Sequence, residues 1–371
     1  MAIKFLYLDD EDLNLVKPVA ESVEGRDSEI IIDIIHPAKF ENNFSELIRE
    51  LKSYHGLILD WRLDVISDPD KEQKFTFRAG AIAQEIRNRE SDDKEPVVPF
   101  PIVLWSTQEK LAASFNRDHT AHDLFDSKSI KDDIGENPIR IREELLSLVH
   151  GYGVISKFSK KSKKNIADLL GTDKNFLDIR IQERFSNGHF PVHEYARFIK
   201  RELLDRPGPL VDEYRLAARL GINKDESKDW IGLLDLLNEQ RYTGPFSDAW
   251  IRWWIYGIEK QWWTTKLDQS KPISFLGADE RVKTIKDKTG FKKIVSAKPI
   301  MPNYHSKFNT ICEHCQKPLD PIDGVILTEE EPEPWQERKY VSLDVALERR
   351  EGFSPHPTEL ERLRSMRRSR G

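Results

Sequence analysis

Acidic residues follow apolar segments at two places in the N-terminal half of the sequence. Asp60 comes directly after residues 57–59, an apolar run typical of a strand buried on both faces of a parallel sheet. Asp9 and Asp10 follow a second such run, residues 3–8. Because the carboxyl ends of parallel strands meet at one edge, we expect the three carboxylates to lie together. Crowded carboxylates repel one another, so the arrangement calls for a hard divalent cation with oxygen ligands, Mg²⁺.

A hydroxyl and an amine follow two further apolar runs. Residues 101–105 are followed by Ser106, and residues 122–125 are followed closely by Lys128. An Asp carboxylate can attack a phosphoryl group as a nucleophile. A Ser hydroxyl can hydrogen-bond a phosphoryl oxygen, and a Lys can pair with it as a point charge. Together with Asp60, these residues predict phosphoryl chemistry.

Helical patterns separate the apolar runs, over residues 44–51, 79–87 and 139–149. Strands that alternate with helices indicate βα units and a parallel sheet. We therefore expect residues 1–150 to form a doubly wound α/β sheet whose carboxyl edge carries the site.

Residues 1–150 resemble the receiver domain of two-component response regulators, which carries an acidic pair, a phosphoacceptor Asp, a Ser or Thr and a Lys in this order. The matching residues are Asp9, Asp10, Asp60, Ser106 and Lys128. The resemblance implies a five-stranded, flavodoxin-like sheet and phosphorylation of Asp60 by a histidine kinase. It implies Mg²⁺ bound directly by Asp10, Asp60 and the main-chain carbonyl of Arg62, and by Asp9 through water. It also implies that Phe125, three residues before Lys128, is the switch aromatic.

Three departures from the family pattern bear on this interpretation. Ser129 follows Lys128, where the family usually has Pro. Residues 65–76 form a polar loop that is longer than usual after the phosphoacceptor. Trp105 and Thr107 flank Ser106 and could alter access to the site. A degenerate receiver that is never phosphorylated therefore stays open as an alternative.

Composition narrows the class of protein. The 371 residues indicate two or three domains. The sequence contains no apolar run long enough for a membrane span, and two cysteines without a secretion signal favour the cytoplasm. The net charge of −6 divides into −12 over residues 1–150 and +6 over the rest. The basic second half permits contact with nucleic acid but does not require it.

Breakers and shifts in composition predict the domain boundaries. We expect a receiver at 1–150, a linker at 151–165, an all-α domain at 166–266, a small α+β region at 267–345 with strands at 291–296, 324–328 and 339–341, and a flexible tail at 346–371.

Two patterns in the expected helical domain have competing interpretations. Residues 215–231 resemble a helix-turn-helix, but the acidic residues at the start of the second helix favour a plain helical hairpin over DNA reading. Residues 246–263 predict a helix with a tryptophan cluster, Trp250, Trp253, Trp254, Trp262 and Trp263, and with an apolar stripe through positions 250, 254, 258 and 262. This stripe is either core or an interface with a second copy or a protein partner.

The spacing of Cys312 and Cys315 resembles a zinc knuckle. Structural zinc needs four nitrogen or sulfur ligands, and the second Cys pair is missing. His305 and His314 are the nearby nitrogen donors. The alternatives are a Zn²⁺ site and a knuckle-like turn with two reduced thiols.

The sequence thus predicts a signalling protein that passes the state of Asp60 to a helical, protein-binding output. A DNA-binding transcriptional regulator and a phosphate sink are the alternatives. We expect no separate catalytic site, since no nucleophile–base pair or Gly-rich phosphate loop is recognisable in the C-terminal half.

Overall fold

The computed structural model describes residues 2–25, 29–40, 43–63, 77–90, 97–113, 115, 119–186, 188, 190–328, 331–348 and 352–370. The expected long loop at 65–76 lies outside these residues. The chain divides into two compact units, each built from several segments. The first unit contains Met1–Leu170, Glu183–Lys200 and Gly244–Trp250. The second contains Gly171–Gln182, Arg201–Thr243 and Ile251–Gly371. The residues expected to form one helical domain, 166–266, are therefore shared between the two units.

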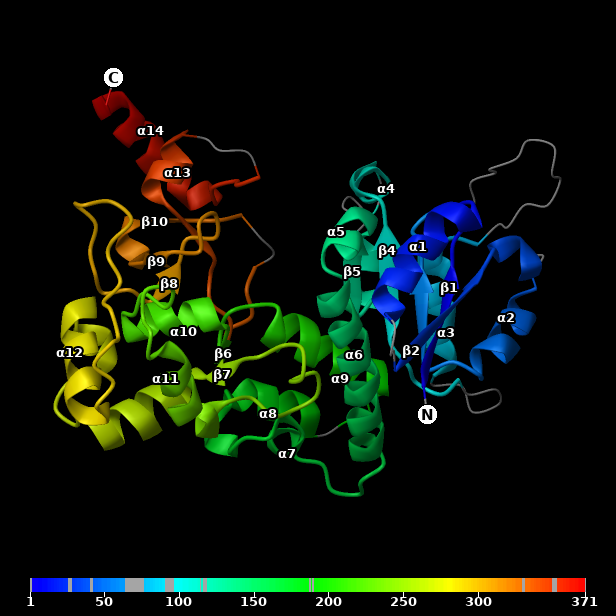
Figure 1. Ribbon diagram of the computed structural model, residues 1–371, viewed down its shortest axis with the longest axis horizontal. Coiled ribbons are helices and arrows are strands. Elements are labelled where there is room, and N and C mark those ends of the chain that lie inside the picture. The colour runs from blue at the N-terminus through cyan, green and yellow to red at the C-terminus, as the bar shows by residue number, and fades with distance from the viewer. Residues whose placement is uncertain are drawn as a thin grey trace. The chain divides into compact units, whose positions relative to one another are not determined.

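The first unit contains a five-stranded parallel sheet (Figure 1). Its strands are β1 (Ile3–Leu8), β2 (Ile30–Ile35), β3 (Gly56–Leu59), β4 (Ile102–Ser106) and β5 (Ser127–Ile130). The order across the sheet is β2-β1-β3-β4-β5, and every neighbouring pair is parallel. This is the flavodoxin-like order, so the expected fold class is confirmed.

Among the described residues, four α-helices lie between the strands of this sheet in the sequence, and a fifth follows β5. They are α1 (Leu13–Glu24), α2 (Phe44–Leu51), α3 (Ala79–Arg89), α4 (Gln108–Ala113) and α5 (Lys131–Glu136). Side-chain caps begin two of them: Asp12 accepts from the Asn14 amide, and Asn43 accepts from the Glu46 amide. The apolar faces of α2 and α3 pack against β1, β3 and β4 in one core. This core fixes where each strand ends, and so where the residues after it lie.

Two strands differ from the prediction. Residues 122–125 belong to a 3₁₀ helix, His119–Leu124, and its following loop, and the fifth strand begins only at Ser127. β5 is an edge strand with the polar sequence SKSI, which carries little apolar signal. Strand β2, with the sequence IIIDII, is not among the segments predicted from the residues themselves.

A long helix, α6 (Pro138–Ser159), continues past the expected boundary at 150 and through most of the expected linker at 151–165. Its buried residues recur at helical spacing and form one face: Ile141, Leu145, Leu148, Tyr152, Ile155 and Phe158. Gly151 lets Phe246 approach closely, because a Cβ there would lie 2.3 Å from the Phe246 ring. The helices α7 (Ile166–Leu170), α8 (Ile179–Ser186) and α9 (Val192–Arg197) follow, and a π-helical segment, Phe198–Leu204, continues α9.

The second unit consists of helices and three small antiparallel strand pairs (Figure 1). The helices are α10 (Glu213–Leu220), α11 (Trp230–Leu236), the π-helical Gly257–Leu267, α12 (Ala278–Thr289), α13 (Leu343–Glu348) and α14 (Leu360–Arg370). The pairs are β6 (Leu210–Val211) with β7 (Trp253–Trp254), β8 (Thr310–Ile311) with β9 (Pro318–Leu319), and β10 (Gly324–Ile326) with β11 (Tyr340–Ser342). The expected strand at 291–296 is reduced to a single bridge between Ile222 and Ser296.

The expected tryptophan helix at 246–263 is not one element. Trp253 and Trp254 form a short strand, whereas Trp262 and Trp263 lie in the π-helical segment. All five tryptophans of the predicted cluster are buried, with exposures from 0% to 9%. They are core residues, and the alternative of a partner surface formed by these rings is wrong.

The C-terminal residues, expected to form a flexible tail with at most a short helix at 357–366, are more ordered than predicted. Residues 360–370 form helix α14, and its Leu363 is 1% exposed in a core cluster with Val325 and Val341. Arg362 donates hydrogen bonds to main-chain carbonyls of the strand β10 region. The basic composition of this segment did not predict its packing, because one buried leucine, Leu363, is enough to hold the short helix against the core.

A buried charge network lies at the amino ends of β4 and β5. The Arg87 guanidinium donates to Asp126 at 2.8 Å and to Glu90 at 2.6 Å. Asp126 also accepts from the Tyr152 hydroxyl on α6 at 2.8 Å, and Glu90 contacts His193 Nδ1 on α9 at 2.6 Å. The network therefore ties α6 and α9 to the sheet within the first unit.

Breaking this network should destabilise the first unit strongly. Arg87→Ala leaves two buried carboxylates without their cation, so we expect the free energy of unfolding to fall by roughly 3–5 kcal/mol. Arg140→Ala removes a more exposed ion pair with Glu144 and should change it by less than about 1 kcal/mol. Urea denaturation followed by circular dichroism measures both. If both variants lost the same free energy of unfolding, the proposed contribution of the Arg87 network to stability would be contradicted.

Candidate functional site

The three predicted carboxylates meet at the carboxyl edge of the sheet. Leu8 of β1 is paired with Leu59 of β3, and the Asp60 amide donates to the Leu8 carbonyl at 3.0 Å. Asp60 therefore lies beside the pair Asp9 and Asp10. One oxygen from each of the three lies within 4.8 Å of the others, and all three side chains are buried.

Ser106 ends β4 at the same edge. It is paired in register with Ile130, the last residue of β5. The Ser106 hydroxyl is buried and has no hydrogen-bond partner among the described residues. A buried hydroxyl without a hydrogen-bond partner is unfavourable. The Ser106 hydroxyl is therefore suited to donate a hydrogen bond to an acceptor atom of a group that binds at the site.

Two aromatic side chains of the sheet, Tyr7 and Trp105, pack against each other, and Tyr7 contacts Asp9. The Tyr7 hydroxyl donates to Asp9 Oδ2 at 2.5 Å, and the Tyr7 ring packs edge-on against Trp105 at 5.3 Å between centroids. Burial and the nearby Asp9 charge raise the pKa of Tyr7, which stays a protonated donor. Tyr7 therefore fixes the orientation of Asp9.

The lysine of the site is not the predicted Lys128. Lys128 lies inside β5, and its ammonium is 5.2 Å from the centroid of the Phe115 ring. Lys131, the first residue after β5, is 2.8 Å from Asp9, 2.8 Å from Glu11 and 3.9 Å from Asp60. The correction follows from the strand itself, because β5 begins later than predicted and the residue after its end moves with it.

The predicted switch aromatic changes for the same reason. In the family this aromatic lies three residues before the lysine, and the residue three before Lys131 is Lys128. Phe125 instead packs edge-on against Trp61 at 6.3 Å and Phe115 at 6.0 Å. It is part of an aromatic cluster attached to the core of the sheet.

Two charged residues that the sequence analysis missed complete the site. Lys110, on α4, is 2.7 Å from Asp60 Oδ2, 3.0 Å from Glu11 and 3.7 Å from Asp10. Glu11 accepts one hydrogen bond from Lys110 and another from Lys131. No local sequence pattern predicted Lys110, because its reach from α4 to Asp60 depends on packing between distant segments.

The carboxylates titrate unusually because they are buried beside one another. Burial, with the charges of Asp60 and Asp9, raises the pKa of Asp10 to about 6 against the lowering effect of Lys110. Burial and the Asp9 charge likewise raise the pKa of Asp60, although both lysines oppose them. For Glu11, hydrogen bonds from Lys131 and Lys110 outweigh burial and lower the pKa. The site therefore holds more negative charge than its two lysines balance.

This donor set fits Mg²⁺. The ligands on offer are carboxylate oxygens, which a hard cation prefers, and the cluster is the one group of three or more candidate ligands among the described residues. The contribution of the Arg62 carbonyl stays a prediction.

The predicted zinc ligands do not form one site: the thiols of Cys312 and Cys315 contact each other, but neither predicted histidine joins them. His305 Nδ1 lies 3.0 Å from Asp323, and the His314 ring packs against Phe353. Cys312 is buried and accepts from the Ser342 amide at 3.3 Å, whereas Cys315 is exposed. The knuckle-like turn with two reduced thiols is therefore the better description, and Zn²⁺ is not supported.

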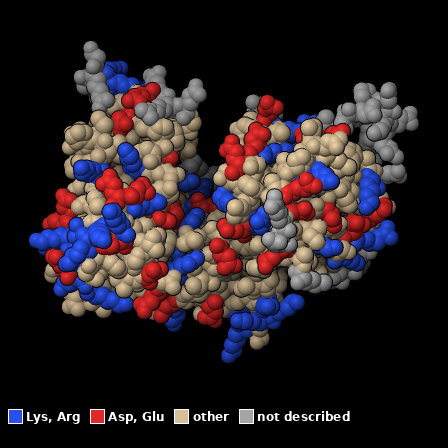
Figure 2. Space-filling model, viewed as in Figure 1, with Lys and Arg blue, Asp and Glu red and all other residues tan. Residues whose placement is uncertain are grey.

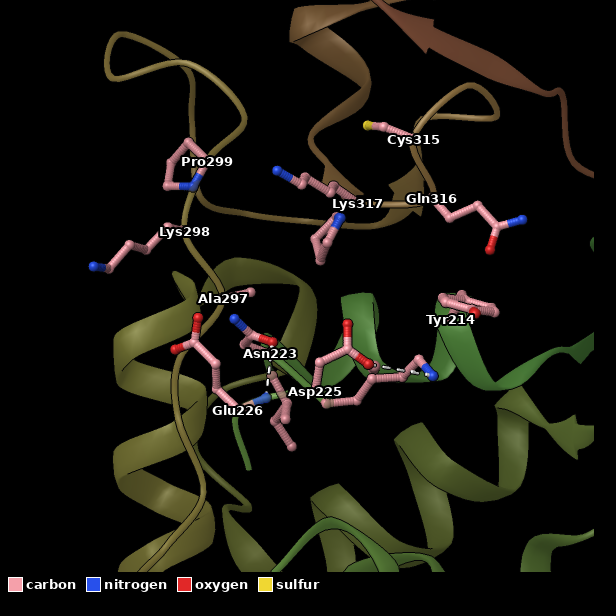
Figure 3. Close-up of a pocket in the computed structure, with 14 residues that line it drawn as sticks. Tyr214, Asn223, Asp225, Glu226, Ala297, Lys298, Pro299, Cys315, Gln316 and Lys317 are labelled. Carbon is pink, nitrogen blue, oxygen red and sulfur yellow. Dashed lines mark hydrogen bonds and ion pairs between the residues drawn. The ribbon is translucent and has the colours of Figure 1, made fainter. Parts of the chain in front are cut away.

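A cavity of about 450 Å³ in the second unit adjoins this turn. Figure 3 shows Cys315, Gln316 and Lys317 on one side of it and Asn223, Asp225 and Glu226 on the other. Lys224, which also lines it, is 3.3 Å from Glu213 and 3.8 Å from Asp225. Because its lining mixes both charges and apolar groups, the cavity does not select one ligand chemistry.

The surface gives little support to nucleic-acid binding. On the face drawn in Figure 2, Lys and Arg are interspersed with Asp and Glu rather than gathered on one surface. The second helix of the helix-turn-helix-like segment, α11, buries Trp230 and Leu233 and follows Asp229. Residues of α10 and α11 belong to one core cluster, and the helical hairpin stays a prediction.

Among the described residues, no helix is both long enough and apolar enough to cross a lipid bilayer.

Comparisons with known proteins give likenesses to solved structures only. No family model matches the sequence, and no curated protein matches it. The chain aligns with a solved structure of the phosphorylated cyanobacterial phytochrome response regulator RcpA at 13% sequence identity. The alignment covers 40% of this chain and 96% of that chain, with a TM-score of 0.25. Because this score is low, the fold assignment rests on the strand order and register described above.

The charge of Asp10 should lower stability in the absence of Mg²⁺. Its folded-state pKa of about 6 lies above its usual value of 3.8, so the folded state binds this proton more tightly than the unfolded chain does. Stability is therefore lost as pH rises from about 4 to about 6. Asp10→Asn should raise the free energy of unfolding at pH 7.5 by about 1 kcal/mol, after allowance for solvent screening, and leave it unchanged at pH 4.

Urea denaturation at both pH values, without and with MgCl₂, tests this expectation. Added Mg²⁺ should stabilise the natural protein at pH 7.5 and stabilise Asp10→Asn much less. Glu109→Gln, which removes an exposed acid on α4, is the matched control. A loss of stability in Asp10→Asn at pH 7.5 would contradict the proposed repulsion among the three carboxylates.

Proposed function

We propose that the protein is a response-regulator-type signalling protein whose Asp60 accepts a phosphoryl group from a histidine kinase. The observation that carries the proposal is the meeting of Asp9, Asp10 and Asp60 at the carboxyl edge of a flavodoxin-like sheet, beside Ser106 and Lys131. A carboxylate nucleophile, an unpaired hydroxyl and an ammonium at one sheet edge are the groups that phosphoryl transfer needs.

In this transfer an oxygen of Asp60 attacks the phosphorus, and the phosphorus–nitrogen bond of the kinase phosphohistidine breaks. The imidazole leaves with the bonding electrons. Asp10 and Asp60 would hold Mg²⁺ directly and Asp9 would hold it through water, and the ion would supply positive charge beside the phosphoryl oxygens. The Ser106 hydroxyl donates to a phosphoryl oxygen, and the Lys131 ammonium pairs with another.

The side chains that would stabilise the phosphorylated Asp60 would also change position when it forms. Lys131 begins α5, so a shift of its ammonium from Asp9 and Glu11 toward a phosphoryl oxygen would act on the β5–α5 junction. The expected consequence is a change in the populations of two states of this surface. We propose that the rest of the chain is a protein-binding output of that change.

The alternatives have weaker support. A DNA-binding output lacks a basic recognition helix in α11 and a basic surface on the face drawn in Figure 2. A phosphate sink differs from the proposed function only in the absence of an output, and no contact in the described residues favours it.

Phosphorylation should require Asp60 and Lys131 but not Lys128. We expect acetyl phosphate with Mg²⁺ to add one phosphoryl group to the full chain, detected by intact mass, and to leave Asp60→Asn unmodified. Lys131→Ala should slow labelling by about 100-fold or more, because it removes the cation that pairs with the phosphoryl oxygens. Lys128→Ala should stay within about threefold of the natural rate, since its ammonium lies over Phe115.

The two lysine variants serve as matched controls for each other, because both remove one positive charge from the same strand region. Labelling of Asp60→Asn at the natural rate would overturn the phosphoacceptor assignment. A loss of labelling in Lys128→Ala but not in Lys131→Ala would restore the lysine predicted from the sequence.

A further inference from the structure

Lys110 reaches the carboxylates from a position that the receiver resemblance does not assign. It lies on α4, and its ammonium is 2.7 Å from Asp60 Oδ2 and 3.7 Å from Asp10 Oδ1. The Asp60 side chain is fully buried, whereas the Lys110 side chain is 22% exposed. Lys110 therefore covers one oxygen of Asp60 from the solvent side.

The two lysines of the site share Glu11 but differ in the aspartates that they contact most closely. Lys131 makes its close contacts with Asp9 and Glu11 and is 3.9 Å from the other Asp60 oxygen, Oδ1. Lys110 instead contacts Asp10 and Asp60, the two side chains expected to bind the divalent cation directly. An ammonium and a divalent cation would thus need the same oxygens, and two cations at one pair of ligands repel each other.

We propose that Lys110 is an internal competitor of the divalent cation. In the resting state its ammonium occupies Asp10 and Asp60, and it has to withdraw before the cation binds. This inference rests on the proposed function, because it concerns the same phosphoacceptor.

Glu11 gives the withdrawing ammonium a place to go. Glu11 Oε1 already accepts from Lys110 at 3.0 Å, and Glu11 is 29% exposed. The four-carbon stem of a lysine can swing its charge outward while one ion pair is kept. The competition therefore exchanges ion pairs rather than leaving a charge unpaired.

Competition of this kind lowers the apparent affinity for the cation. The measured dissociation constant equals the intrinsic one divided by the fraction of molecules whose site is open. The cation concentration then decides how much of the protein can accept a phosphoryl group, and Lys110 sets the threshold.

Isothermal titration of the full chain with MgCl₂ tests the proposal. Lys110→Gln keeps a polar side chain of similar length without the charge and should bind Mg²⁺ about tenfold more tightly, or more. Lys17→Gln is the matched control, because Lys17 is an exposed lysine on α1 that pairs with Glu21 at 3.5 Å. It should leave the affinity unchanged. An equal or weaker affinity in Lys110→Gln would overturn the proposal.

A second measurement uses the natural protein and does not depend on how the variant folds. Amine acetylation followed by peptide mass spectrometry reports how accessible each lysine is. Saturating Mg²⁺ should accelerate labelling of Lys110 severalfold and leave Lys17 unchanged. A rate for Lys110 that does not respond to Mg²⁺, in a protein that binds Mg²⁺, would overturn the competition.

Failure of this inference and failure of the proposed function give different results. If Lys110→Gln and the natural protein bind Mg²⁺ equally and are both labelled by acetyl phosphate, only the competition is wrong. If neither binds Mg²⁺ and neither is labelled, both the competition and the phosphoacceptor assignment are wrong.

Discussion

Repulsion among buried carboxylates is the constraint on which the first unit depends. Asp9, Asp10 and Asp60 are held together by strand ends that the sheet register fixes, and none of them can move into water. Two lysines from the following helices, on α4 and α5, offset part of this charge. The fold therefore keeps a site of excess negative charge that favours a cation of higher charge.

The opposite edge of the same sheet is arranged differently. There the buried Arg87 is surrounded by Asp126, Glu90 and the hydroxyl partner of Asp126, Tyr152. Both carboxylates there accept hydrogen bonds at 2.6–2.8 Å, and the guanidinium is shared between them, which suits a structural role. The contrast separates two uses of buried charge in one sheet: an incomplete cluster that can take part in chemistry, and a complete one that joins helices to the sheet.

The sequence was enough to place the residues that follow strongly apolar strands. Asp60 and Ser106 are at the predicted positions, because β3 and β4 are buried on both faces and their sequences show it. Lys128 was misplaced because β5 is a polar edge strand whose start has no apolar signal. The reach of Lys110 from α4 to Asp60 depends on packing between distant segments, which no local pattern encodes. Helix α14 is likewise placed by the burial of Leu363 in a core formed elsewhere in the chain.

The segmented make-up of the two units has a consequence for how the protein can be inherited. The chain passes from one unit to the other five times, and the short segment Gly244–Trp250 returns to place Phe246 against Gly151. A gene fusion or deletion with a single breakpoint would leave each product short of part of its own core. Recombination that replaces the second unit would also have to keep residues 183–200 and 244–250, which belong to the first unit. We therefore expect the two units to be inherited together.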